Sequence, residues 1–120
     1  MVAALDQVRE AVEAGADYLG ICTNDEAAQI RGKYPDHPVM RLRSALPDEL
    51  EESARRLQVE EIVGSLDVAE FVAGLGRRRG RPVPIHLKLD TGMGRTGFLP
   101  GELDQARRVC AMKGLSLRGI

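Results

Sequence analysis

The chain has 120 residues, of which 43% are hydrophobic and 29% charged, and its formal net charge is −1. Such a length supports one modest domain, and the composition is ordinary for a globular protein. A charge near zero gives no electrostatic basis for binding nucleic acid or an anionic membrane surface. No apolar run reaches the roughly 20 residues that span a bilayer, and the first residues lack the pattern of a secretory signal. A cytoplasmic enzyme fits these features, with Cys22 and Cys110 predicted to be buried, reduced thiols.

Hydrophobic periodicity and capping signals predict a regular alternation of helices and strands. Asn24 is the predicted N-cap of the second helix. The predicted helices are 4–14, 24–31, 47–57, 67–78 and 102–112, and the predicted strands are 17–23, 39–43, 61–64, 83–89 and 115–120. Each pair of strands is bridged by one helix, so right-handed crossovers make the strands parallel in one sheet. This α/β rhythm fits a doubly wound sheet and a TIM barrel equally well.

The fourth predicted strand leads into the most informative segment of the chain. Ile85, Leu87 and Leu89 alternate with His86, Lys88 and Asp90, which predicts one apolar and one polar face. Residues 90–97, Asp-Thr-Gly-Met-Gly-Arg-Thr-Gly, follow at once. Their glycines allow tight turns and close approach to a ligand, and an arginine held past the end of a strand suits an anionic or phenolate oxygen.

Segment 90–97 resembles the signature of the alanine racemases, enzymes of the barrel fold type that use pyridoxal 5′-phosphate (PLP). Segment 14–20, residues 25–27 and Arg31 resemble the same family over its strand-to-helix region. The resemblance implies a partial TIM (β/α)8 barrel of about five parallel strands. Residues 1–120 would be strands two to six of the N-terminal PLP-binding barrel, without the C-terminal β domain.

The resemblance also implies where the cofactor lies. Arg95 matches the family arginine that hydrogen-bonds the phenolic oxygen of PLP, and Leu42 matches an apolar residue near the cofactor ring. Met93 and Gly94 match positions that line the loop. Taken without the resemblance, an arginine after a glycine turn is a surface residue, and a leucine at a strand end is ordinary core.

Lys88 and Asp90 are expected to support Arg95. A lysine buried near an arginine is electrostatically unfavourable, and loss of its proton relieves the repulsion. The neutral amine can then take up carbon dioxide as a carbamate, the form in which the matching family lysine often supports the arginine. The alternative is an ordinary ion pair between Lys88 and Asp90.

Arg41 and Arg43 depart from the alanine racemase pattern and are closer to the related broad-specificity amino-acid racemases. Those enzymes, however, tend to lack the equivalents of Lys88 and Asp90, so the substrate range stays open. Alternatively, the two arginines simply meet helix carboxylates. His37 and His86 show no metal spacing, and we expect no metal site.

The resemblance implies a reaction that this chain does not complete. In the family, two bases remove and return the α-proton of alanine on opposite faces of the external aldimine, within a cytoplasmic homodimer that supplies D-alanine for the cell wall. The lysine that binds PLP and the tyrosine base are expected to lie outside residues 1–120, so we predict no catalytic residue here and no activity of the chain alone. The alternatives are a broad-specificity racemase and a non-catalytic truncated or binding domain. Small PLP-binding homeostasis proteins of the same barrel type lack this form of the loop.

Overall fold

The computed structural model describes residues 2–120, with side chains from Leu5 onward. Helices and strands alternate as predicted. The helices are α1 (Val2–Glu13), α2 (Asn24–Lys33), α3 (Pro47–Glu52), α4 (Leu66–Arg79) and α5 (Leu103–Cys110), with a π-helical turn at Ser53–Leu57 and a 3-10 turn at Pro100–Glu102. The strands are β1 (Leu19–Ile21), β2 (Val39–Arg41), β3 (Glu61–Val63), β4 (Val83–Leu87) and β5 (Leu115–Gly119).

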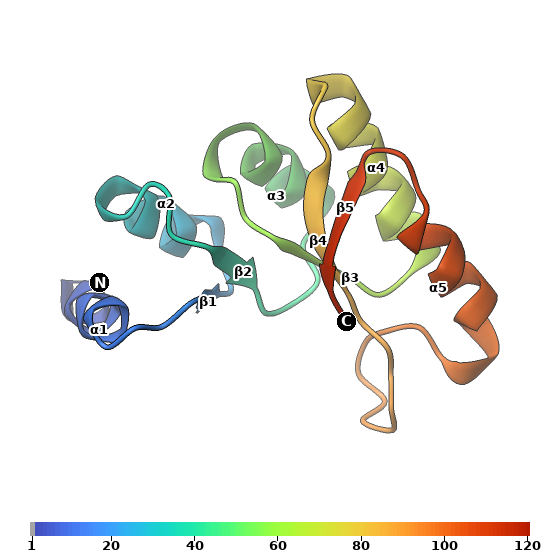
Figure 1. Cartoon of the computed structure of the whole chain (residues 1–120), viewed down its shortest axis with the longest axis horizontal. Coiled ribbons are helices and arrows are strands. Elements are labelled where there is room, and N and C mark those ends of the chain that lie inside the picture. The colour runs from blue at the N-terminus through green and yellow to red at the C-terminus, as the bar shows by residue number, and fades with distance from the viewer. Residues whose placement is uncertain (1) are drawn as a thin grey trace.

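All the paired strands are parallel and lie in sequence order, β1 beside β2 and then β3, β4 and β5. A single parallel bridge between Met40 and Glu60 joins the two groups. Helices α2 to α5 form an arc on one side of this row of strands (Figure 1). One covered face is the arrangement of a barrel wall, whereas a doubly wound sheet carries helices on both faces. The predicted partial barrel of five parallel strands is therefore the fold of this chain.

The N-cap of α2 is Thr23, and the prediction of Asn24 was wrong by one residue. The Thr23 hydroxyl accepts from the amide of Glu26 at 3.2 Å, and the Glu26 carboxylate accepts from the amide of Thr23 at 3.0 Å. This reciprocal capping box satisfies two amides at the helix start. It also leaves the side chain of Asn24 available for tertiary contacts.

The predicted helix 47–57 begins as expected at Pro47 but is α-helical only as far as Glu52. The last turn widens to π-helical geometry over Ser53–Leu57 and ends at Gln58, whose φ of 53° is left-handed. Arg31 of α2 donates to the carbonyls of Leu57 (2.7 Å) and Gln58 (3.0 Å). These bonds satisfy carbonyls at the helix end, which local sequence patterns did not reveal.

Two hydrophobic clusters lie between the strands and the helices. The larger packs β3 and β4 against α4 and α5, and the smaller packs β1 and β2 against α2. The predicted burial of Cys22 and Cys110 was wrong, since both thiols are exposed. Cys22 directly follows buried Ile21 at the end of β1, so the strand alternation turns it outward, and Cys110 follows buried Val109 in α5.

Candidate functional site

Strand β4 has the two faces that its alternation predicts. Val83, Ile85 and Leu87 are buried under the helices, whereas His86 and Lys88 on the other face are only half-buried. Lys88, expected to be a buried lysine near Arg95, is only partly buried in this chain. Its face of the sheet is the inner face of the partial barrel, and none of the described helices covers that face.

A loop after β4 leaves the strand at Lys88 and returns to it at Phe98. The Phe98 amide donates to the Lys88 carbonyl, and the Asp90 amide donates to the Phe98 carbonyl, both at 2.9 Å. The Phe98 side chain is 1% exposed and belongs to the larger core cluster. The loop is thus closed at its base and anchored in the core, and it projects at the carboxyl ends of β4 and β5 (Figure 1).

The loop glycines have the backbone angles expected of them. Gly92, Gly94 and Gly97 have φ values of 130°, 70° and 118°. At Gly97 space is also limiting, because a Cβ there would lie 2.8 Å from the amide nitrogen of Asp90. A Cβ on Gly64, at the end of β3, would in turn lie 3.0 Å from Gly97. The loop base therefore packs backbone against backbone, which only glycine permits.

Asp90 holds the loop through its side chain. One carboxylate oxygen accepts from the amides of Gly92 (2.9 Å) and Gly94 (3.1 Å). These amides, Gly92 first, lower the pKa of Asp90 because they stabilise its charged form. No ion pair with Lys88 forms among the described residues, so the alternative of a Lys88–Asp90 pair is not what the structure contains. Asp90 supports the loop backbone directly.

The predicted cofactor residues meet around one hollow. A cavity of about 230 Å³ is lined by Leu42, Lys88, Asp90, Met93 and Arg95, together with neighbouring loop residues. Leu42 and Met93 are exposed by 57% and 77%, and the Arg95 side chain is also exposed. Gly94 lies within the same loop. Leu42, after β2, forms an apolar wall of this cavity. Lys88, after β4, and Arg95 of the loop form a cationic wall.

Leu42 is set in place by its neighbour on β1. Its amide donates to the carbonyl of Ile21 at 2.8 Å, and its side chain lies over Gly20. A Cβ on Gly20 would stand only 2.7 Å from the leucine. The absence of a side chain at Gly20 therefore lets Leu42 lie across the inner face of the sheet, toward the cavity.

Arg43 lies at the rim of the cavity, and it is one of the two arginines whose role the sequence left undecided. Arg43 donates to both carboxylate oxygens of Glu49 in α3, at 2.5 and 3.0 Å, as the helix-carboxylate alternative predicts. Glu49 also accepts from the amide of Leu46 at 2.8 Å. Together these bonds, the Arg43 contact first, lower the pKa of Glu49 to about 2. They fix the chain that leads from β2 into α3.

Arg41 makes a buried ion pair that the sequence analysis missed. Its guanidinium donates to both oxygens of Glu61 in β3, at 2.8 and 3.2 Å, with side-chain exposures of 0% and 3%. The expected helix carboxylate was wrong for this residue. The available signal was a pair of opposite charges on neighbouring strands, each two residues from a buried valine (Val39 or Val63) and so on the same face of its strand. Burying either charge is costly unless it has an oppositely charged partner in good hydrogen-bond geometry.

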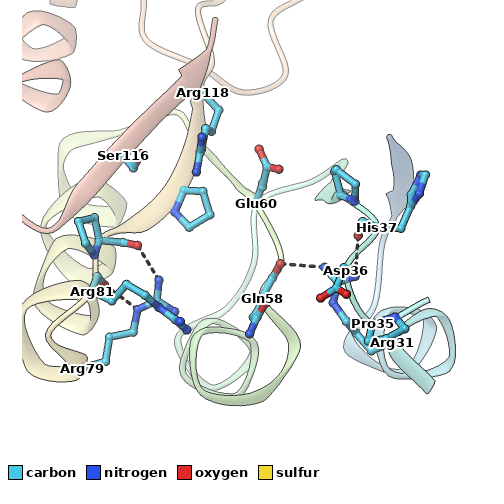
Figure 2. Close-up of a pocket in the computed structure, with 13 residues that line it drawn as sticks. Arg31, Pro35, Asp36, His37, Gln58, Glu60, Arg79, Arg81, Ser116 and Arg118 are labelled. Atoms are coloured by element: carbon cyan, nitrogen blue, oxygen red, sulfur yellow. Dashed lines mark hydrogen bonds between the residues drawn. The ribbon is translucent and has the colours of Figure 1, made fainter. Parts of the chain in front are cut away.

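A second hollow, of about 410 Å³, lies at the amino-terminal edge of the strands and is bordered by arginines (Figure 2). Two of these arginines bond backbone carbonyls of neighbouring segments. Arg79 donates to the carbonyls of Ala54, Arg81 and Pro82, each at 2.7 Å. Arg31 donates to the carbonyls of Leu57 and Gln58, at the end of the π-helical turn. Burial lowers the pKa of both Arg31 and Arg79. We therefore assign Arg31 and Arg79 a structural role, which is to hold backbone segments of the fold together.

Among the described residues, neither His86 nor His37 belongs to a cluster that could ligate a metal. Within residues 2–120 no group of three or more histidine, cysteine, aspartate or glutamate side chains could hold a metal ion. His86 instead contacts Glu60 at 3.0 Å, and the Tyr18 hydroxyl donates to the same carboxylate oxygen at 3.2 Å. Nor does any helix of the described chain have the length and apolar character needed to cross a bilayer.

The fold and the site together define a barrel domain of parallel β/α units whose strand ends carry a cationic, glycine-rich loop. A sequence profile of the "Alanine racemase, N-terminal domain" matches residues 2–120. The chain belongs to the alanine racemase family.

Individual relatives agree with this assignment. The chain is 37% identical to an alanine racemase of Desulforamulus reducens over 119 residues, which are 98% of this chain and 32% of that protein. It is 34% identical to a broad specificity amino-acid racemase of Aeromonas hydrophila over 117 residues, 94% of this chain and 28% of that protein. The chain thus spans about a third of the length of these curated relatives.

Solved structures share the fold. An alanine racemase of Clostridium difficile 630 superposes with a TM-score of 0.87 at 22% identity, over 97% of this chain and 31% of that one. An alanine racemase from E. faecalis gives a TM-score of 0.78 at 28% identity, over 94% of this chain and 31% of that one. The strands and helices described above are therefore a segment of the alanine racemase barrel.

Proposed function

We propose that this chain is part of the PLP-binding barrel of a racemase that interconverts L- and D-alanine. The observation that carries the proposal is the hollow at the strand ends, where Leu42, Lys88 and Arg95 meet. Bound PLP would supply the electron sink that makes the α-proton of the amino acid removable. The residues of this chain would hold and orient the cofactor.

The side chains present fit one part of that cofactor. A planar guanidinium can donate to the phenolic oxygen of PLP, which is the role proposed for Arg95. Leu42 offers an apolar surface for the ring, and Met93 borders the loop. Asp90 keeps the loop in shape through the amides of Gly92 and Gly94. The groups that bind the cofactor covalently and move the substrate proton are proposed to lie outside residues 1–120.

Lys88 is proposed to support Arg95 as a carbamate. Its neutral amine nitrogen would bond to the carbon of carbon dioxide and release one proton to solvent, leaving an anion that accepts from Arg95. Two observations support this. Lys88 lines the same hollow as Arg95, and no carboxylate of the described chain pairs with it within 4.0 Å.

The complete protein is proposed to be about three times as long, in keeping with its relatives. In that protein residues 1–120 would form strands two to six of the barrel. A C-terminal β domain would follow, and a cytoplasmic homodimer would bring in the tyrosine base from the partner subunit. The family resemblance supports these points.

A broad-specificity racemase is the second candidate. The similarity to the Aeromonas hydrophila protein favours it, as do Arg41 and Arg43. The presence of Lys88 and Asp90 favours an alanine racemase over a broad-specificity racemase. The two candidates differ in substrate range, so the full-length protein is to be assayed for racemisation of alanine and of a panel that includes basic amino acids. Comparable rates on lysine or arginine would reject the alanine racemase in favour of the broad-specificity enzyme.

A non-catalytic truncated or binding domain is the third candidate. We expect the chain, mixed with PLP and reduced with borohydride, to give no adduct at one defined lysine. It contains Lys33, Lys88 and Lys113 only. A single stoichiometric adduct at Lys88 would contradict the supporting role proposed for that residue. A full-length protein that neither binds PLP nor racemises any amino acid would leave the non-catalytic domain as the function.

A further inference from the structure

The joint between β2 and β3 is the weakest connection in the row of strands. The other neighbouring strands pair over three or more residues, whereas β2 and β3 share one bridge among the described residues. Its two hydrogen bonds run from the Arg41 amide to the Glu60 carbonyl (3.0 Å) and from the Glu60 amide to the Val39 carbonyl (2.8 Å). We call this joint the β2/β3 seam.

The two walls of the cofactor hollow stand on opposite sides of the seam. Leu42 follows β2 directly, and its amide is bonded back to β1. Lys88 follows β4, and its amide donates to the carbonyl of Val63 in β3 at 2.8 Å. The distance between the leucine wall and the cationic wall therefore depends on how β2 and β3 are held together.

Side chains join the seam where backbone pairing is sparse. Arg41 precedes Leu42, and Glu61 lies two residues before Val63. Their bidentate ion pair crosses from β2 to β3 on the helix-facing side. The Arg41 guanidinium also donates to the Asn24 side chain at 2.6 Å and to the Cys22 carbonyl at 3.1 Å, which ties in the ends of β1 and α2.

Glu61, like Arg41, has a hydrogen-bond partner besides the ion pair. Glu61 also accepts from the Ser53 hydroxyl at 2.8 Å, in the first residue of the π-helical turn. A forked guanidinium–carboxylate pair fixes distance and orientation together. A buried pair of this kind contributes little net stability compared with apolar residues of similar size, because desolvation opposes the attraction. Its geometry, by contrast, cannot be reproduced by apolar contacts.

We propose that Arg41 and Glu61 are positioning residues that set the separation between the Leu42 wall and the Lys88–Arg95 wall of the cofactor hollow. The identity of the ligand in that hollow rests on the proposed function. The positioning role itself rests on the contacts across the seam and does not depend on which ligand the hollow binds.

The test uses the full-length protein with the double variant Arg41→Met/Glu61→Leu, which removes both charges at once. The matched control is Arg56→Met/Glu52→Leu, which removes an exposed pair (2.7 Å apart) of the same chemistry. We expect the control to unfold within about 3 °C of the parent, since an exposed pair is worth little. The first variant should lose more stability, because the Asn24 and Cys22 oxygens and the buried Ser53 hydroxyl lose their partners. We expect the first alone to weaken PLP binding, with a Kd at least tenfold higher by absorbance titration.

Hydrogen exchange tests the seam without any cofactor. The amides of Arg41 and Glu60 are expected to exchange at least tenfold faster in the first double variant, with those of β4 unchanged. Unchanged exchange and unchanged Kd in that variant would overturn the proposal. If the variant does not fold, Arg41→Lys decides, because it keeps the charge but loses the fork; parent-like exchange and Kd in that variant would also overturn it.

The two proposals can fail separately. A parent protein that binds no PLP would reject the proposed function, while faster exchange at the seam would still support the positioning role of Arg41 and Glu61. Normal PLP binding in the parent together with no effect in the double variant would reject the positioning role alone.

Discussion

The backbone amide of Phe98 donates to the carbonyl of Lys88 at 2.9 Å, so the last residue of the glycine loop is hydrogen-bonded to the strand residue from which the loop starts. The Phe98 ring is buried in the core at the same time. One residue therefore connects the shape of the candidate cofactor loop with the stability of the domain.

Replacing Phe98 with alanine is expected to destabilise the protein by about 3–5 kcal/mol, the usual cost of removing a buried aromatic ring. Leu99→Ala is the control, because Leu99 is 52% exposed and its truncation should change stability by less than about 0.5 kcal/mol. Urea unfolding measures both. Equal losses in the two variants would mean that Phe98 does not anchor the loop in the core.

Gly97→Ala is expected to distort the loop base. Gly97 combines a φ of 118° with a Cβ position 2.8 Å from the backbone of Asp90, so alanine adds both strain and a clash. The strain alone costs about 1–3 kcal/mol. Gly101→Ala is the control, since Gly101 lies in open space without a positive φ. Unfolding midpoints that fall by the same small amount in both variants would contradict the close packing at Gly97.

Glu49 is expected to titrate with a pKa of about 2, mainly because of its bonds from Arg43. A carboxyl whose pKa is lower in the folded state stabilises the fold above its unfolded pKa, and this contribution is lost as the pH falls toward 2. In Arg43→Gln the pKa of Glu49 should rise toward 4.5, so its folded and unfolded values come closer and the acid-induced loss of stability between about pH 4.5 and 2 should become smaller. Carboxyl NMR titration measures the shift, and a Glu49 pKa unaffected by this substitution would contradict the assignment.

Arg95→Lys tests the proposed contact with the cofactor. Lysine keeps the charge but lacks the planar fork that would reach both the PLP oxygen and Lys88. We expect weaker retention of PLP on dialysis and at least a tenfold slower racemisation, about 1.4 kcal/mol in the barrier. Arg108→Lys, on the exposed side of α5, is the control. Full retention and full activity in Arg95→Lys would remove Arg95 from the cofactor site.

Local patterns in the sequence were sufficient for much of this structure. Alternating helix and strand periods predicted the order of the elements, and period-two alternation predicted which side of β4 faces the core. The three glycines of the loop were expected to allow unusual turns, and their φ values agree. These features depend on neighbours within a few residues, which is the range that sequence periodicity and backbone sterics cover.

Other features required the folded chain. The cap at Thr23 freed Asn24 for Arg41, and the Thr-x-x-Glu spacing from Thr23 to Glu26 was a local signal that the prediction of Asn24 overlooked. The π-helical turn brought Ser53 to Glu61 and leaves no comparable local signal. Arg41 and Glu61 are 20 residues apart, and their pairing depends on which strands lie side by side.

Local residue patterns account for the alternation of elements, the two faces of β4 and the glycine-rich, cationic composition of the loop, because each follows from residues close together in the chain. The assembled fold sets which charges pair, how deeply Lys88 is buried and where Phe98 packs. Those outcomes depend on the desolvation and contact of side chains from distant segments, and these are defined only when the strands and helices have assembled.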